Sequence, residues 1–167
     1  MCDYCGCRTQ ASIARFGEEH DRIASVAEYL RAAHTRGDRD GAAAIASALL
    51  SLLVPHVARE EGALFPELAV AGAPHHVQRL EDEHEQFELA LRPIAGGVAS
   101  TSEWAALPRV IDGLRAHIWT EEFDVFPAAL QLLDPSAWQR VEEGCGTSSA
   151  SSPSAPERRS ERPVTYR

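Results

Sequence analysis

Lysine is absent from this chain of 167 residues, so all 16 of its lysine-or-arginine positions are arginines. They are outnumbered by 25 aspartates and glutamates, which gives a formal net charge of −9 at pH 7. An excess of negative charge repels phosphate backbones and anionic lipid headgroups. The composition therefore argues against a nucleic-acid groove or an anionic membrane surface as the partner of this protein.

A long, unbroken hydrophobic run is also missing. The longest apolar stretch, Ala42 to Val57, is interrupted by Ser47, Ser51 and Pro55 and falls short of the roughly 20 residues that span a bilayer. The chain opens with Met-Cys-Asp-Tyr and without the apolar region of a signal peptide. We expect a cytoplasmic protein with reduced thiols and no membrane partner, and its length and 44% hydrophobic content fit one domain.

Two stretches of the chain repeat one another. The first runs from His56 to Pro66 and the second from His117 to Pro127, and both read His-x3-Glu-Glu-x3-Phe-Pro. On a helix, residues four apart lie on the same face, so each copy presents an imidazole and a carboxylate together. A buried carboxylate costs several kcal/mol unless something positive compensates it. The repeat therefore predicts a metal site.

Apolar residues recur at alternating spacings of three and four in four segments, which is the pattern of bundle helices. The segments span residues 13–34, 45–64, 77–98 and 107–132, and histidine, or histidine and glutamate, interrupts each near its middle. Turn-forming sequences separate them at residues 36–41, 71–74 and 96–102. Because short connections make neighbouring helices antiparallel, we predict an all-α, up-down-up-down four-helix bundle.

The heights of the polar residues in such a bundle can be compared. In an antiparallel pair, two residues equally far from the intervening turn lie at the same height. The pairs His20 and His56, Glu60 and His84, and His84 and His117 each have their midpoint inside a predicted turn. Six residues are therefore expected to meet in one layer of the interior: His20, His56, Glu60, His84, His117 and Glu121.

Four imidazoles and two carboxylates suit iron, manganese or zinc rather than a thiophilic ion. Six ligands are too many for one tetrahedral zinc. If Glu60 and Glu121 both bridge, the set supplies eight ligand atoms toward about twelve positions of two octahedral ions. A bridging oxide or hydroxide fills two more, which leaves about two positions for a small molecule or for further protein ligands. The predicted site is therefore open.

The order His, His-x3-Glu, His, His-x3-Glu resembles that of the hemerythrin-like, or HHE, family of non-haem diiron four-helix bundles. It is matched by His20, His56 with Glu60, His84, and His117 with Glu121, and the resemblance covers about residues 10 to 133. Ferritin-like diiron bundles instead carry Glu-x-x-His on two helices. The oxygen-carrying hemerythrins have His-x3-His on the third helix and a final aspartate.

This chain has Glu88 and Glu121 at the two positions that distinguish the oxygen carriers. The match is closer to bacterial, especially actinobacterial, hemerythrin-like proteins and to the iron-sensing domain of a eukaryotic ubiquitin-ligase subunit. The resemblance implies two oxo- or hydroxo-bridged iron ions that bind, sense or react with oxygen, peroxide or nitric oxide. An oxidoreductase that scavenges peroxide or nitric oxide and a sensor without turnover both stay open, and no protein partner is indicated.

Three further glutamates and four cysteines have open roles. Glu61, Glu88 and Glu122 are either additional ligands, partners that orient the histidines, or ordinary solvated residues. The cysteines form a separate zinc site or a redox group, or the three near the N-terminus belong to a flexible reduced end. They are Cys2, Cys5, Cys7 and Cys145.

The predicted organisation has four parts. A cysteine-rich segment at residues 1–9 precedes the bundle at residues 10–133, and a short capped helix follows at residues 134–143. Residues 144–167 are rich in serine, proline and arginine and are expected to be disordered.

Overall fold

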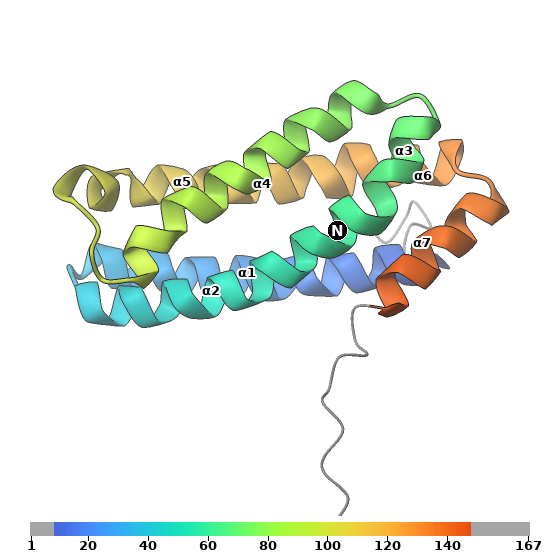
Figure 1. Cartoon of the computed structure of the whole chain (residues 1–167). Helices are drawn as coiled ribbons and strands as arrows, with labels where there is room; N and C mark the ends of the chain where they lie inside the picture. Colours follow the sequence, from blue (N-terminus) through green and yellow to red (C-terminus); the bar gives the residue numbers. More distant parts are fainter. Residues whose placement is uncertain (1–8, 148–167) are drawn as a thin grey trace, which may run out of the picture.

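The computed structural model describes residues 9–147, except for the side chains of residues 74–76 and 147. Four long helices run alternately up and down and form the body of the molecule (Figure 1). They are α1 (Ala11–Thr35), α2 (Arg39–Arg59), α4 (Pro74–Ala95) and α5 (Thr101–Thr120). The prediction of an all-α four-helix bundle is confirmed.

Each copy of the repeated motif ends in a widened helical turn. A π-helical segment, Glu60–Leu64, joins α2 to α3 (Phe65–Val70), and another, Glu121–Val125, joins α5 to α6 (Phe126–Leu132). The Phe-Pro pair that closes each copy explains this geometry, because proline has no N–H to donate and its ring clashes with the carbonyl four residues earlier. A wider turn relieves that clash without ending the helix.

Glycines with positive φ end two of the long helices. Gly37 (φ +68°) follows α1 and Gly97 (φ +67°) follows α4, a conformation that residues with a side chain rarely adopt. Asp38 then caps α2 by accepting a hydrogen bond from the N–H of Gly41 at 2.8 Å. Ser100 and Glu103 form a reciprocal capping box at the start of α5.

The hydrophobic core is divided in two by a polar layer. One apolar cluster, with Leu30 and Leu49 among its members, fills the end of the bundle near the α1–α2 and α4–α5 turns. The other, with Phe16 and Phe126, fills the end covered by α3, α6 and the last helix, α7 (Pro135–Thr147). Between them lie four buried histidines and two fully buried glutamates, the six predicted ligands.

The segment from Arg39 to Val70 is 32 residues of helix, long and apolar enough by composition to cross a bilayer. This differs from the sequence expectation, because serine and Pro55 interrupt the apolar run but not the helix. The same segment buries Leu49 and Leu53 in the core and carries two residues of the polar layer. Core helices of bundles also satisfy such a composition test.

The last helix, α7 (Pro135–Thr147), packs across one end of the bundle (Figure 1). It begins where the sequence predicts, with Asp134 accepting a hydrogen bond from the N–H of Ala137 at 2.8 Å, and runs four residues beyond the predicted end at 143. Glu142 accepts from the N–H of Ser12 at 3.0 Å. Cys145 is buried in the apolar cluster, so packing keeps this last turn helical.

Candidate metal centre

The four buried histidines form two close pairs. Nε2 of His20 lies 3.1 Å from Nε2 of His56, between α1 and α2. Nε2 of His84 lies 2.9 Å from Nε2 of His117, between α4 and α5. Two ligands bound at right angles to one ion at about 2.1 Å lie about 3.0 Å apart. Each pair therefore has the spacing of neighbouring ligands on one metal ion.

The two central glutamates lie between the histidine pairs. Glu121 places Oε2 at 3.1 Å from His20 Nε2 and Oε1 at 3.2 Å from His117 Nε2. Glu60 places Oε2 at 3.3 Å from His56 Nε2 and 3.5 Å from His84 Nε2. Glu121 thus reaches both pairs with different oxygens, which is the arrangement of a bridging carboxylate.

All four carboxylate oxygens of Glu60 and Glu121 are buried and accept no hydrogen bond from any described residue. Buried carboxylates of this kind are costly unless positive charge compensates them, and two facing carboxylates repel each other as well. Among the described residues, two groups have ligand atoms close enough to share an ion: His20, His56, Glu60 and Glu121, and His84, His117 and Glu121. The donor set therefore fits two cations bridged by carboxylate.

A separate carboxylate holds the outer nitrogen of each of the four buried histidines. Nδ1–H of His20 donates to Glu122 at 3.2 Å, and Nδ1–H of His84 donates to Glu61 at 3.0 Å. Because an ionised carboxylate only accepts, the proton of each neutral ring is on Nδ1 and the lone pair of Nε2 faces inward. Such partners orient ligand histidines and raise their basicity.

The other two histidines have partners that the sequence analysis missed. Nδ1–H of His56 donates to Glu19 at 3.0 Å, and Nδ1–H of His117 donates to Glu83 at 2.8 Å. Both glutamates directly precede a ligand histidine, a Glu-His dipeptide that occurs on α1 and on α4. This dipeptide was the sequence signal that could have indicated the two glutamates. Each of them, however, accepts the hydrogen bond of a histidine on the neighbouring helix.

In the absence of metal, protonated histidines compensate part of the negative charge of the buried glutamates. Burial disfavours the imidazolium of His20, but contact with Glu121 and Glu122 outweighs it and raises the pKa of His20 to about 10. Burial and the charge of His20 lower the pKa of His56. In the second pair, burial is outweighed by Glu121 and Glu83, so the pKa of His117 is raised. Each pair therefore favours one shared proton where an ion would bind.

The central carboxyls differ in their protonation. Burial, and then the charge of Glu121, raises the pKa of Glu60 well above 4.5. Burial also acts to raise the pKa of Glu121, but the imidazoles of His117 and His20 outweigh it and hold that pKa well below 4.5. The imidazoles thus favour the ionised form of Glu121, while Glu60 favours its protonated form.

Phenylalanine rings line the centre. Phe126 stacks on His20 with centroids 5.6 Å apart, and Phe65 stacks on His84 at 5.8 Å, so the two motif phenylalanines wall the site. Phe16 meets His56 edge-on at 5.8 Å, and Phe87 meets His117 edge-on at 5.4 Å. Each imidazole is therefore held by an aromatic ring on one side and a carboxylate at its edge.

The remaining predicted residues lie elsewhere. Glu88 accepts a hydrogen bond from Nη2 of Arg92 at 2.6 Å. Glu88 belongs to neither ligand group. Cys145 is buried in the apolar cluster, where burial raises the pKa of its thiol. Cys2, Cys5 and Cys7 lie outside the described residues.

The family model described as the hemerythrin HHE cation binding domain matches residues 11–129. The chain belongs to the hemerythrin family. The matched range contains all six residues of the polar layer, so the predicted hemerythrin-like resemblance is confirmed at the level of the family. No curated protein and no solved structure matches this hemerythrin domain significantly.

Proposed function

We propose that this hemerythrin domain is a non-haem diiron protein that binds or reacts with oxygen, peroxide or nitric oxide. The observation that carries the proposal is the inward direction of four histidine Nε2 atoms around two fully buried carboxylates without hydrogen-bond partners. Nitrogen and oxygen donors in this ratio suit iron. Bound iron would supply the electrons exchanged with a small oxidant.

The residues of this chain have separate tasks in such a centre. His20 and His56 would hold one ion, His84 and His117 the other, and Glu60 and Glu121 would lie between them. The carboxylates on the Nδ1 atoms fix the rings in the neutral, metal-binding tautomer. The phenylalanines beside the rings would restrict the entry of bulk water.

The finer assignments extend this proposal. Because Glu88 replaces the second histidine of the oxygen carriers' His-x3-His and pairs with Arg92, each half keeps two histidines. This supports a member of the bacterial type rather than a reversible oxygen carrier. A separate zinc or redox site at the four cysteines stays a prediction.

Metal analysis with an optical spectrum tests the diiron centre. We expect two irons per chain and the near-ultraviolet absorption of a bridged ferric pair, whereas one zinc and no colour would contradict the proposal. Reaction with peroxide and with nitric oxide then tests function. Multiple turnovers that His117→Ala abolishes would support a scavenging enzyme.

A sensor is the second candidate, and the unpartnered oxygens of Glu60 and Glu121 favour it. Cations that compensate these oxygens bind the folded state only, so iron occupancy would strongly stabilise the bundle. A stoichiometric reaction without turnover, together with a large iron-dependent rise in melting temperature, would support sensing over catalysis.

A further inference from the structure

The two halves of the metal centre differ in their distance from solvent. On the α4 side, the carboxylates that hold the histidines are Glu61 and Glu83, and 37% and 32% of their side chains are exposed. On the α1 side, the corresponding carboxylates are Glu122 and Glu19, with 7% and 15% exposed. The half that contains His84 therefore lies nearer the surface.

Arg59 closes the other half. Its side chain is 10% exposed, and its Nη2 lies 2.8 Å from Oε2 of Glu19, the same oxygen that holds His56. The matching residue of the second motif copy is Thr120, whose hydroxyl donates to a carbonyl of its own helix. A threonine is too short to cover Glu83 in the same way. The cavity beside Glu19 and Arg59 measures only about 90 Å³.

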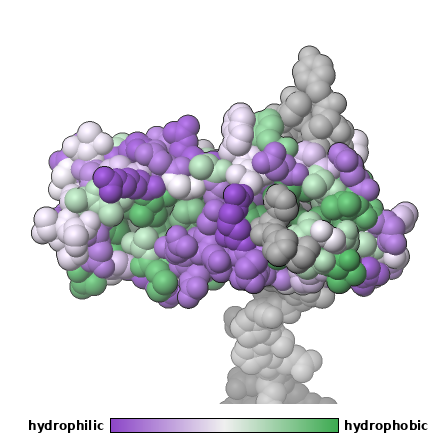
Figure 2. Space-filling view, turned by 90° about the horizontal axis from the view of Figure 1, so that it is seen from above, coloured by the Kyte–Doolittle hydropathy of each residue, from purple (hydrophilic) through white to green (hydrophobic). Residues whose placement is uncertain are grey.

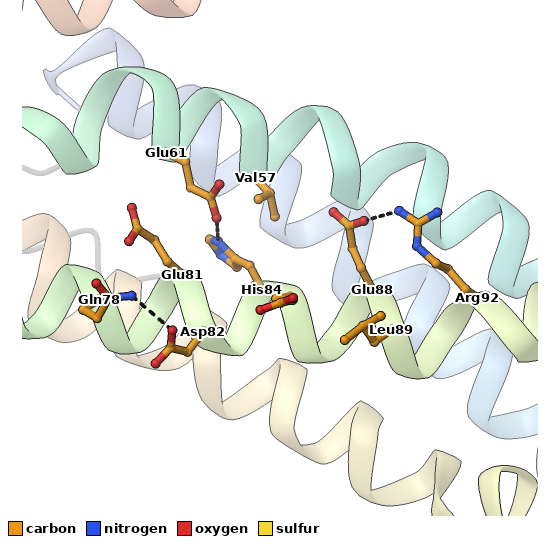
Figure 3. Close-up of a pocket in the computed structure, with 10 residues that line it drawn as sticks. Val57, Glu61, Gln78, Glu81, Asp82, His84, Glu88, Leu89 and Arg92 are labelled. Atoms are coloured by element: carbon orange, nitrogen blue, oxygen red, sulfur yellow. Dashed lines mark hydrogen bonds and ion pairs between the residues drawn. The ribbon is translucent and has the colours of Figure 1, made fainter.

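A larger cavity of about 550 Å³ opens beside His84, lined by residues of α2, of the π-helical segment after it and of α4. Glu61 reaches across it to the His84 ring, and Glu81 and Glu88 flank that ring along α4 (Figure 3). Its charged lining consists of five acids and one base: Glu61, Glu81, Asp82, Glu85, Glu88 and Arg92.

One imidazole separates this cavity from the metal centre. His84 is 2% exposed and lines the cavity, and its Nε2 lies 3.5 Å from the unpartnered Oε2 of Glu60. A cation held by Glu61 is therefore one side chain away from an inner carboxylate. Figure 2 shows hydrophilic side chains across the middle of one face of the molecule, with apolar patches to either side.

We propose that divalent cations enter and leave the dinuclear site through this acidic cavity, past His84, while Arg59 keeps the opposite half closed. Carboxylates attract a hydrated divalent cation and raise its local concentration. They repel anions, so the route favours metal over anionic reactants. The inference rests on the proposed metal binding and is independent of any reaction with oxidants.

Loading kinetics of the metal-free, full-length protein test this route. Stopped-flow mixing with Co²⁺ follows uptake through the cobalt absorption bands. We expect the double variant Glu81→Gln/Glu85→Gln to load about fivefold more slowly at low salt, with the difference shrinking at high salt. Both side chains line the cavity without belonging to a ligand group, so the final two equivalents should be unchanged.

A matched control removes two charges from the closed half. Glu18 and Asp21 are exposed on α1 beside His20, and Glu18→Gln/Asp21→Asn should load within twofold of the wild type. Equal rates for the two double variants, or slower loading of the control, would overturn the route. Normal loading to two equivalents, together with an iron-loaded protein that neither binds nor reacts with oxygen, peroxide or nitric oxide, would refute the oxidant function and leave the route supported.

Discussion

Replacing Glu60 by glutamine should stabilise the metal-free protein while weakening its metal binding. Glu60 is fully buried, and neither of its oxygens accepts a hydrogen bond from a described residue. Its pKa is raised well above 4.5 by burial and by Glu121. Folding without metal at pH 7 therefore requires either a buried charge or the uptake of a proton.

The size of this cost can be bounded. Protonating a carboxyl group with an ordinary pKa of 4.5 at pH 7 costs 1.36 kcal/mol for each of 2.5 pH units, or about 3.4 kcal/mol. Glutamine avoids this cost, but its amide needs hydrogen-bond partners of its own. We expect a net gain of about 1 to 3 kcal/mol, which corresponds to about 3 to 9 °C for a domain of this size.

The pH dependence follows from the direction of the shifts. A carboxyl group with a raised pKa binds more protons when folded, so the metal-free protein loses stability as the pH rises above 4.5 toward the folded pKa of Glu60. His20, raised from 6.5 to about 10, also loses its contribution as the pH rises through that interval. The lowered pKa values of His56 and His84 oppose this trend, but only below the ordinary imidazole pKa of 6.5. The wild type should therefore become less stable from pH 7 to 9, and Glu60→Gln should lose less.

Urea unfolding in a chelator at pH 5, 7 and 8.5 measures these differences. Glu18→Gln, an exposed change of the same type, should stay within about 0.5 kcal/mol of the wild type. Addition of metal should then stabilise the wild type more than Glu60→Gln. A lower unfolding free energy for metal-free Glu60→Gln at pH 7 would show that the Glu60 oxygens are already compensated, which would refute the reasoning.

Three further predictions concern other parts of the molecule. Metal binding at pH 8 should release at least one proton, from His20, and calorimetry in buffers of different ionisation enthalpy would detect none if the reasoning is wrong. Glu83→Gln should weaken metal affinity about 10- to 100-fold in a chelator competition, whereas an equal loss for Glu88→Gln would contradict the assigned partners. Gly144→Ala places a β-carbon 2.7 Å from an alanine side chain and should lower stability by about 1 to 3 kcal/mol, while Gly146→Ala, with no described atom within 4 Å of the added carbon, should not.

Much of the site could be predicted because the bundle has simple geometry. Equal distances from a turn place residues at equal heights, so the meeting of His20 with His56 and of His84 with His117 follows from sequence separation alone. The same reasoning cannot find Glu19 or Glu83. Their contacts depend on how far each helix is rotated about its axis, which apolar periodicity gives only coarsely.

The π-helical segments were missed for a related reason. On a regular α-helix, the two neighbouring glutamates of each Glu-Glu pair point in clearly different directions. In the structure Glu60 faces the other ligands while Glu61 holds His84 from the cavity side. A wider turn reduces the angle between neighbours, so both carboxylates can serve one centre.

Positions that are identical in the two motif copies and a position that differs between them have different consequences for the metal centre. The second glutamate and the phenylalanine of the two motif copies hold His20 and His84 in equivalent ways, with a carboxylate and a ring beside each imidazole. One position that differs in the length of its side chain is Arg59 in one copy and Thr120 in the other. Arg59 is 10% exposed and lies 2.8 Å from Glu19, whereas Arg79, the arginine beside Glu83, is 57% exposed and lies 3.7 Å from it. An almost symmetric ligand set thus acquires one closed side and one side open to an acidic cavity. Symmetry explains why two ions fit, and the buried Arg59 explains why they would not exchange equally.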